Sequence, residues 1–211
     1  MLDKKKFYIN GKWIEPTKKN DFEVINPSNE ESFAVISLGS KADVDLAVKV
    51  SKEAFETWKE TTKEERIKLL ENLLSVYKKR FSEMTEAISK EMGAPMDWSS
   101  NVQNASGQAH LEDFIIRLKN FKFDEQFDSK SNNQIFYEPI GVCGLITPWN
   151  WPINQIALKV IPALATGCTM ILKPSEIAPV SAMLFAEMIH EAGFPPGVFN
   201  LVNGDGAGVG T

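Results

Sequence analysis

Residues 141–176 read GVCGLITPWNWPINQIALKVIPALATGCTMILKPSE, and this stretch decides the fold of the 211-residue chain. Within it, residues 142–146 form an apolar run with the length of a buried strand. A helix is expected over about 153–165, and residues 169–172 form a second apolar run of strand length. The stretch therefore predicts a strand, a helix and a strand in that order.

The same alternation continues along the chain. Residues 180–192 suit a second helix, and residues 198–202 suit a third strand. Because strands joined by helices make right-handed crossovers, the sequence predicts an α/β fold with a doubly wound parallel sheet. Lys, Arg, Asp and Glu number six among residues 139–211 and 45 among residues 1–138. This scarcity of charge is typical of strands that are covered on both faces.

The N-terminal part predicts a hairpin followed by helices. Asn10-Gly11 stands between two apolar runs, which is the strongest short hairpin signal, because both turn positions need positive φ. Ser40 and Thr62 can each cap a helix, and a third helix is expected to stop at Gly93. A fourth helix is expected over most of residues 97–121. Short strands are also expected at residues 23–25 and 33–36.

Composition argues against several classes of protein. The formal net charge is −5, so no basic face for nucleic acid is expected, and Lys4-Lys5-Lys6 is interpreted as a solvated N-terminus. No apolar stretch approaches the ~20 residues of a membrane span, and no secretory signal is recognised. The two cysteines, Cys143 and Cys168, are interpreted as reduced and inert core thiols of a cytoplasmic protein. His110 and His190 lack metal-ligand spacing, so no metal site is predicted.

Unusual residues follow each of the three predicted strands of the second half. The segments are 147–152, 173–176 and 203–210. The carboxyl ends of parallel strands lie at one edge of a sheet, and ligands bind in open α/β sheets at that edge. We therefore expect the three segments to meet in one ligand site.

Each segment also has a structural interpretation. The glycine run is either a plain turn or a phosphate-binding loop, and Val209 stands where the dinucleotide fingerprint counted from Gly204 needs its third glycine. Lys173 and Glu176 are either solvated loop side chains or a pair that binds ribose hydroxyls. Asn150 either caps the following helix or presents an amide donor.

Taken together, these motifs resemble the NAD(P)-dependent aldehyde dehydrogenase family. The resemblance is carried by residues 141–176 and by GFPPGVFNLVNGDGAGVG at 193–210. YINGKW at 8–13 and EVINPSNEE at 23–31 also resemble the N-terminus of that family. The match covers essentially the whole chain, and PWN followed by KPSE at this spacing is far more specific than a glycine pattern.

The resemblance implies a domain organisation. It suggests a Rossmann-like cofactor domain whose N-terminal hairpin and helices occupy residues 1–120 and whose βαβαβ core occupies residues 140–211. Residues 121–139 resemble part of an arm that passes strands between subunits. The family resemblance therefore implies a homo-oligomer, either a dimer or a tetramer.

The resemblance also implies site residues. Asn150 matches the amide that stabilises the oxyanion of the reacting aldehyde. Cofactor-binding positions are implied at Ile146, Thr147, Pro148, Trp149, Lys173, Ser175, Glu176, Gly206 and Gly210. Because a carboxylate at Glu176 accepts hydrogen bonds from ribose hydroxyls and repels a 2′-phosphate, NAD is favoured over NADP, although Lys173 leaves room for both.

In this family an aldehyde is oxidised to a carboxylic acid through a thiohemiacetal, hydride transfer to NAD and hydrolysis of a thioester. The sequence stops at Thr211, before the family's Gly-Ser-Thr turn, general base and cysteine nucleophile, and neither Cys143 nor Cys168 matches that nucleophile. We therefore expect the chain to be catalytically incomplete. Because the sheet has an open edge and uncovered apolar faces, we also expect the isolated chain to self-associate or to be poorly stable. The alternative is a stand-alone, non-catalytic nucleotide-binding or interaction module, which a native stop in the encoding DNA would favour.

Overall fold

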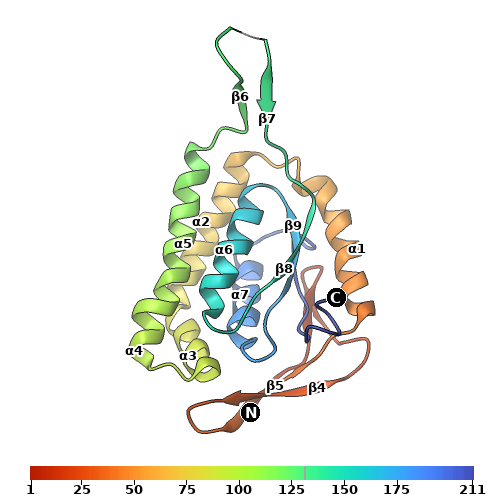
Figure 1. Ribbon diagram of the computed structural model, residues 1–211, viewed down its shortest axis with the longest axis vertical. Helices are drawn as coiled ribbons and strands as arrows, with labels where there is room; N and C mark the ends of the chain where they lie inside the picture. The colour runs from red at the N-terminus through yellow and green to blue at the C-terminus, as the bar shows by residue number, and fades with distance from the viewer. Residues whose placement is uncertain (131) are drawn as a thin grey trace.

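The central sheet has the strand order β3-β2-β10-β9-β8 (Figure 1). The computed structural model describes residues 1–130 and 132–211. β8 (Val142–Ile146), β9 (Thr169–Lys173) and β10 (Phe199–Leu201) pair in parallel. The parallel βαβαβ core predicted from the sequence is therefore confirmed.

Helices cover both faces of this sheet. α6 (Pro152–Ala165) and α7 (Val180–Glu191) connect the parallel strands, and α1 (Lys41–Trp58) lies on the opposite face (Figure 1). The alternation of side chains along β9 explains the two layers: Met170 and Leu172 belong to the cluster with α6 and α7, whereas Ile171 belongs to the cluster with α1. The doubly wound arrangement follows from this alternation.

The N-terminal hairpin belongs to the same sheet, which makes the sheet mixed. β2 (Phe7–Ile9) and β3 (Lys12–Ile14) flank Asn10 and Gly11, whose φ values are +53° and +74°. The predicted hairpin is therefore confirmed, with both turn positions at positive φ. The expectation that it only precedes the parallel sheet is corrected, because Tyr8 of β2 pairs antiparallel with Leu201 of β10.

A second sheet lies beside the N-terminus. It has the order β1-β5-β4, with β1 at Leu2–Lys4, β4 at Asp21–Asn26 and β5 at Glu31–Ser37. β4 and β5 confirm the two short strands predicted there. β1 pairs in parallel with β5, so Lys4 lies in a strand and not in a solvated terminus.

The N-terminal helices pack against α6 and α7. Their bounds are Lys63–Lys79 for α2, Phe81–Met92 for α3, Met96–Trp98 for α4, Ser99–Asn104 for the π-helical segment η1 and Ala105–Asn120 for α5. α1 and α2 begin after Ser40 and Thr62 with capping boxes, and α3 ends at Gly93, as predicted. None of the described helices combines the length and the apolar character that crossing a lipid bilayer requires.

The predicted fourth helix is interrupted by η1. Asn104, which is fully buried, donates from Nδ2 to the Phe81 carbonyl and to Thr85 Oγ1, both at 2.8 Å. The Tyr77 hydroxyl donates to Asn104 Oδ1 at 2.5 Å. A π-helical segment places one extra residue in the turn, and here it carries the buried amide that satisfies α2 and α3.

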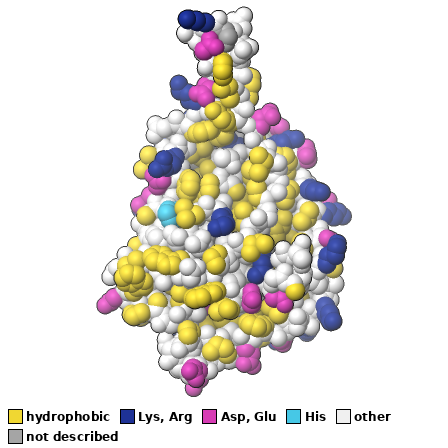
Figure 2. All heavy atoms as spheres, in the orientation of Figure 1, with side chains coloured by type: hydrophobic (Ala, Val, Ile, Leu, Met, Phe, Trp, Pro, Cys, Tyr) yellow, Lys and Arg dark blue, Asp and Glu magenta, His cyan; other side chains and the backbone are white. Residues whose placement is uncertain are grey.

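β8 forms an edge of the central sheet, which corrects the prediction of a buried strand. Gly144 and Ile146 are exposed, and Ile146 retains 55% of its accessible surface. Apolar side chains gather across this face of the molecule (Figure 2). Ile140, two residues before β8, is 90% exposed.

A hairpin stands away from the body of the molecule (Figure 1). β6 (Asp124–Gln126) and β7 (Gln134–Phe136) pair antiparallel within the predicted arm at 121–139. Residue 131 of that arm lies outside the described residues. The form of this segment suits an arm, whereas its role between subunits stays a prediction.

A buried carboxylate joins α3 to α7. Glu91 Oε2 accepts hydrogen bonds from the backbone N–H of Val180 at 2.7 Å and of Ser181 at 3.2 Å. Burial raises the pKa of Glu91 to about 7, whereas its hydrogen bonds act in the opposite direction. The ionised form is therefore costly at this position despite its donors.

Replacing Glu91 by Gln should remove a pH dependence of stability. The pKa of Glu91 is higher in the folded than in the unfolded chain. The contribution of Glu91 to the free energy of unfolding is therefore complete below pH ~4.5 and is lost as the pH rises through about 7. Urea unfolding of both proteins should be measured from pH 5 to pH 8. Over this range the unfolding free energy of the wild type should fall by on the order of 3 kcal/mol relative to that of Glu91→Gln. A constant difference between the two proteins over this range would contradict the assignment.

Gly11→Ala should destabilise the hairpin. Its φ is +74°, and a Cβ at this position would lie 3.1 Å from Pro196 Cβ and Cγ. The expected loss in unfolding free energy is about 1–3 kcal/mol, measured by urea unfolding. Gly193→Ala is the matched control, because Gly193 has φ of +87° but no neighbour within 4 Å of the added Cβ. Equal losses in the two variants would show that Pro196 contributes nothing.

Candidate cofactor-binding site

Three loops meet at one edge of the central sheet. The register pairs Ile146 with Lys173 and Leu172 with Leu201, so β8, β9 and β10 end side by side. Beyond the strand end, the Thr147 N–H donates to the Lys173 carbonyl at 3.1 Å. The convergence predicted for segments 147–152, 173–176 and 203–210 is therefore present.

The loop after β8 exposes most of its residues. Thr147 is buried, at 3% exposure, whereas Pro148, Trp149 and Asn150 are exposed. α6 begins at Pro152, and the preceding residue in the N-cap position is Trp151. The capping alternative for Asn150 is thus wrong, and its amide is accessible at the edge of the sheet.

The loop after β9 carries an ion pair. Lys173 is 7% exposed, and its Nζ donates to Glu176 Oε2 at 3.2 Å. A buried ammonium needs a partner, so the alternative of a solvated lysine is wrong. The Glu176 side chain remains 27% exposed, which leaves acceptor capacity at the surface. Ser175 is buried, and its Oγ accepts from the Ile177 N–H at 3.3 Å.

The loop after β10 is organised by Asp205. Its Oδ1 accepts from the Gly208 N–H at 2.6 Å, and its carbonyl accepts from the Gly210 N–H at 3.1 Å. A Cβ on Gly210 would lie 2.7 Å from the Gly206 carbonyl oxygen, so only glycine fits there without movement. A Cβ on Gly206 would meet nothing within 4 Å, so this backbone faces open space.

Two residues that shape this loop were not singled out by the sequence patterns. One is Asp205, which stood out only as a charge among glycines. The other is Gly39, whose N–H donates to the Asn203 carbonyl at 2.8 Å and whose added Cβ would lie 2.7 Å from Val202 Cγ1. The only signal for Gly39 is its place just before the capping residue Ser40.

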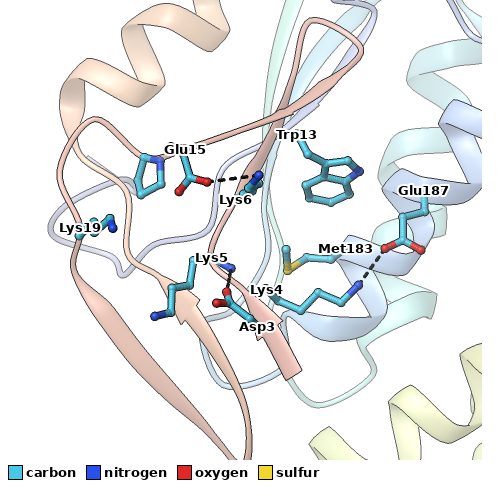
Figure 3. A pocket seen from close by; sticks show the side chains of 10 residues that line it. Asp3, Lys4, Lys5, Lys6, Trp13, Glu15, Lys19, Met183 and Glu187 are labelled. Carbon is cyan, nitrogen blue, oxygen red and sulfur yellow. Dashed lines mark hydrogen bonds and ion pairs between the residues drawn. The ribbon is translucent and has the colours of Figure 1, made fainter. Parts of the chain in front are cut away.

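The lysines of the N-terminus line a different cavity of about 460 Å³ (Figure 3). Lys4 Nζ lies 2.9 Å from Glu187 Oε1, and Lys6 Nζ lies 3.2 Å from Glu15 Oε1. Lys5 also has an acidic partner, Asp21, at 2.8 Å. These positive charges are neutralised by neighbouring carboxylates, which argues against an anion site there.

The two cysteines lie away from the loops that meet at the sheet edge. Cys168 is buried, Cys143 is partly buried, and both are free. Burial, with a smaller contribution from the neighbouring Cys168 thiol, raises the pKa of Cys143 to about 11. A thiol with a raised pKa is a poor nucleophile at neutral pH, in line with the prediction of an inert thiol.

The assembled edge offers a defined set of chemical groups. A buried ammonium is paired with a partly exposed carboxylate, an exposed indole and an exposed amide lie on the adjacent loop, and a glycine-rich backbone faces open space. Such a set suits a ligand that carries both hydroxyls and an extended polar backbone.

Comparison with known proteins identifies the family. The family model described as "Aldehyde dehydrogenase family" matches residues 13–211. The 3-succinoylsemialdehyde-pyridine dehydrogenase of a Pseudomonas species is 49% identical over 211 residues, which is 100% of this chain and 44% of that protein. The chain therefore spans less than half the length of this relative.

Solved structures agree with this assignment. The crystal structure of an aldehyde dehydrogenase from Bartonella henselae has a TM-score of 0.98 and 56% identity, covering 100% of this chain and 44% of that one. Aldehyde dehydrogenase C of Pseudomonas syringae, a mutant complexed with NAD+ and octanal, has a TM-score of 0.94 and 45% identity, covering 98% of this chain and 42% of that one. The chain belongs to the aldehyde dehydrogenase family.

Proposed function

We propose that this chain supplies the NAD-binding part of an enzyme that oxidises an aldehyde to a carboxylic acid. The observation that carries the proposal is the Lys173–Glu176 pair at the edge where three loops meet. In this proposal residues 140–211 form the core of the cofactor domain, residues 1–120 complete it, and residues 121–139 belong to an oligomerisation arm.

The pair suits the adenosine ribose of the cofactor. Glu176 is partly exposed, so its carboxylate can accept hydrogen bonds from two ribose hydroxyls while it holds Lys173 Nζ. The same negative charge would repel the 2′-phosphate of NADP. NAD+ is bound in the 45%-identical Pseudomonas syringae structure, which supports NAD as the cofactor here.

The other loops would complete the cleft. Exposed apolar groups on the β8 loop can pack against the cofactor, and the open space at Gly206 lets a pyrophosphate approach the backbone. We propose cofactor contacts for Ile146, Thr147, Pro148, Trp149, Lys173, Ser175, Glu176, Gly206 and Gly210.

Asn150 is the proposed catalytic residue of this part of the protein. Its exposed amide can donate to the oxygen of the reacting aldehyde, where negative charge develops. NAD, when bound, supplies the acceptor for the hydride. Because burial raises the pKa of the Cys143 thiol and Cys168 is buried, we assign neither as the nucleophile. We therefore propose that the chain by itself binds NAD without oxidising aldehydes.

A calorimetric titration tests this function. The chain should bind NAD with a Kd tighter than ~1 mM. Glu176→Gln should weaken NAD about 10-fold through the lost charged acceptor and should narrow the preference for NAD over NADP. Glu60→Gln, at an exposed position two residues after the end of α1, is the matched control.

The outcomes separate the possible functions. Absence of saturable NAD binding would overturn the proposal for this chain. Reduction of NAD by the chain with an aldehyde would overturn its catalytic incompleteness. NAD binding together with a native stop codon after Thr211 would favour the stand-alone nucleotide-binding module.

The projecting hairpin supports a proposal of self-association. Phe127 is 63% exposed and Phe136 is 65% exposed, so the arm carries apolar surface that a second subunit could cover. We propose a dimer or tetramer formed through this arm. Sedimentation velocity should show species above 23.6 kDa, and Phe136→Ser should shift them toward the monomer. A sharp monomer of the unchanged chain at micromolar concentration would contradict the proposal.

We place the protein in the cytoplasm. Cys143 and Cys168 line the same cavity and are both free. Neighbouring thiols persist in a reducing compartment, which supports this location.

A further inference from the structure

The N-terminus of α7 receives its cap from a distant helix. The first backbone N–H groups of any helix lack acceptors within the helix. The residue in the N-cap position is Pro179, and no side chain caps the helix from there. Glu91 in the last turn of α3 replaces this cap, since it accepts from Val180 at 2.7 Å and from Ser181 at 3.2 Å. Its side chain is almost wholly buried, with 2% exposure.

α7 is also the point at which the loop after β9 ends. That loop, residues 174–179, follows Lys173. The sheet fixes Lys173, because it pairs with Ile146 and its carbonyl accepts from the Thr147 N–H. Within it, the Ala178 N–H donates to the Ser175 carbonyl at 3.2 Å. So short a loop has few conformations once both ends are fixed. The position of the α7 N-terminus therefore helps to set where the loop side chains lie.

We propose that Glu91 is a positioning residue for the cofactor site, because by fixing the start of α7 it places Glu176 against Lys173. Glu91 itself touches neither of these side chains and is not a catalytic residue. The effect of Glu91 on NAD binding rests on the proposed function. The structural part, the placement of residues 174–179, stands on the hydrogen bonds of Glu91 alone.

The position calls for a side chain of glutamate length that ends in acceptor oxygens. Two adjacent N–H donors point at it, and both oxygens of a carboxyl group carry lone pairs that can accept from them. Gln keeps the shape but replaces one acceptor oxygen by an NH₂ group, which can only donate and so cannot accept from a backbone N–H. Asp keeps both carboxyl oxygens but is shorter by one methylene group.

Amide exchange measured by NMR tests the placement. In Glu91→Gln, the amides of Ile177, Ala178 and Val180 should exchange about 10-fold faster, the factor expected when one buried hydrogen bond is lost. Glu86→Gln, at an exposed position on the same helix, should leave these rates unchanged. Both variants are compared well below their melting temperatures, so that global unfolding does not contribute. Glu91→Asp takes the place of Glu91→Gln if the latter does not fold.

NAD titration of the same proteins tests the consequence. Glu91→Gln should weaken NAD about 10-fold, and Glu86→Gln should bind as the wild type does. A lower melting temperature with unchanged loop exchange and unchanged NAD affinity would overturn the inference, because Glu91 would then only stabilise the fold. If the wild type bound no NAD, the proposed function would fail. The amide exchange rates would then test by themselves whether Glu91 places residues 174–179. Faster exchange in Glu91→Gln would support that placement, and unchanged exchange would overturn it.

Discussion

The parallel ladder between β8, β9 and β10 is the constraint on which the candidate site depends. Pairing of Ile146 with Lys173 and of Leu172 with Leu201 brings three chain segments to one edge. A shift of register by one residue would turn the side chains of β9 to the opposite faces and would separate Met170 and Leu172 from α6 and α7. The same apolar alternation that builds the core therefore fixes the position of the polar groups at its rim.

Buried polar groups in this protein are satisfied by partners far away in the sequence. Asn200 in β10 is fully buried; its Nδ2 donates to Ser51 Oγ at 2.8 Å, and its Oδ1 accepts from the Asn10 N–H at 2.9 Å. Asn104 and Glu91 serve the helices in the same way. Each such group costs free energy unless it is paired, so these contacts specify which elements pack together as well as stabilising them.

Local chemistry made much of the fold predictable from the sequence. Asn10-Gly11, Ser40, Thr62 and Gly93 act on the residues next to them, and the elements that they bound lie where predicted. At the site, the order of strands and loops predicted the meeting of three segments, whereas the sequence left open whether Lys173 and Glu176 are solvated, and the hydrogen bond between them was found only in the structure.

What the sequence did not predict depends on contacts between distant residues. The pairing of β2 with β10, the edge position of β8 and the partners of the N-terminal lysines all involve elements that no local pattern connects. The role of Asp205 depends on a loop geometry that several glycine-rich sequences could adopt.

The place of the hairpin in the central sheet has a consequence for the order of folding. Asn10 and Asn200, which join the hairpin to β10, are 190 residues apart, so their contact closes a very long loop. Such non-local contacts slow folding, since the entropy of closure is lost before the contact is gained. During synthesis β2 must wait until residues 199–201 have left the ribosome. Until then, among the strands that the structure describes, β2 can pair in the central sheet only with β3.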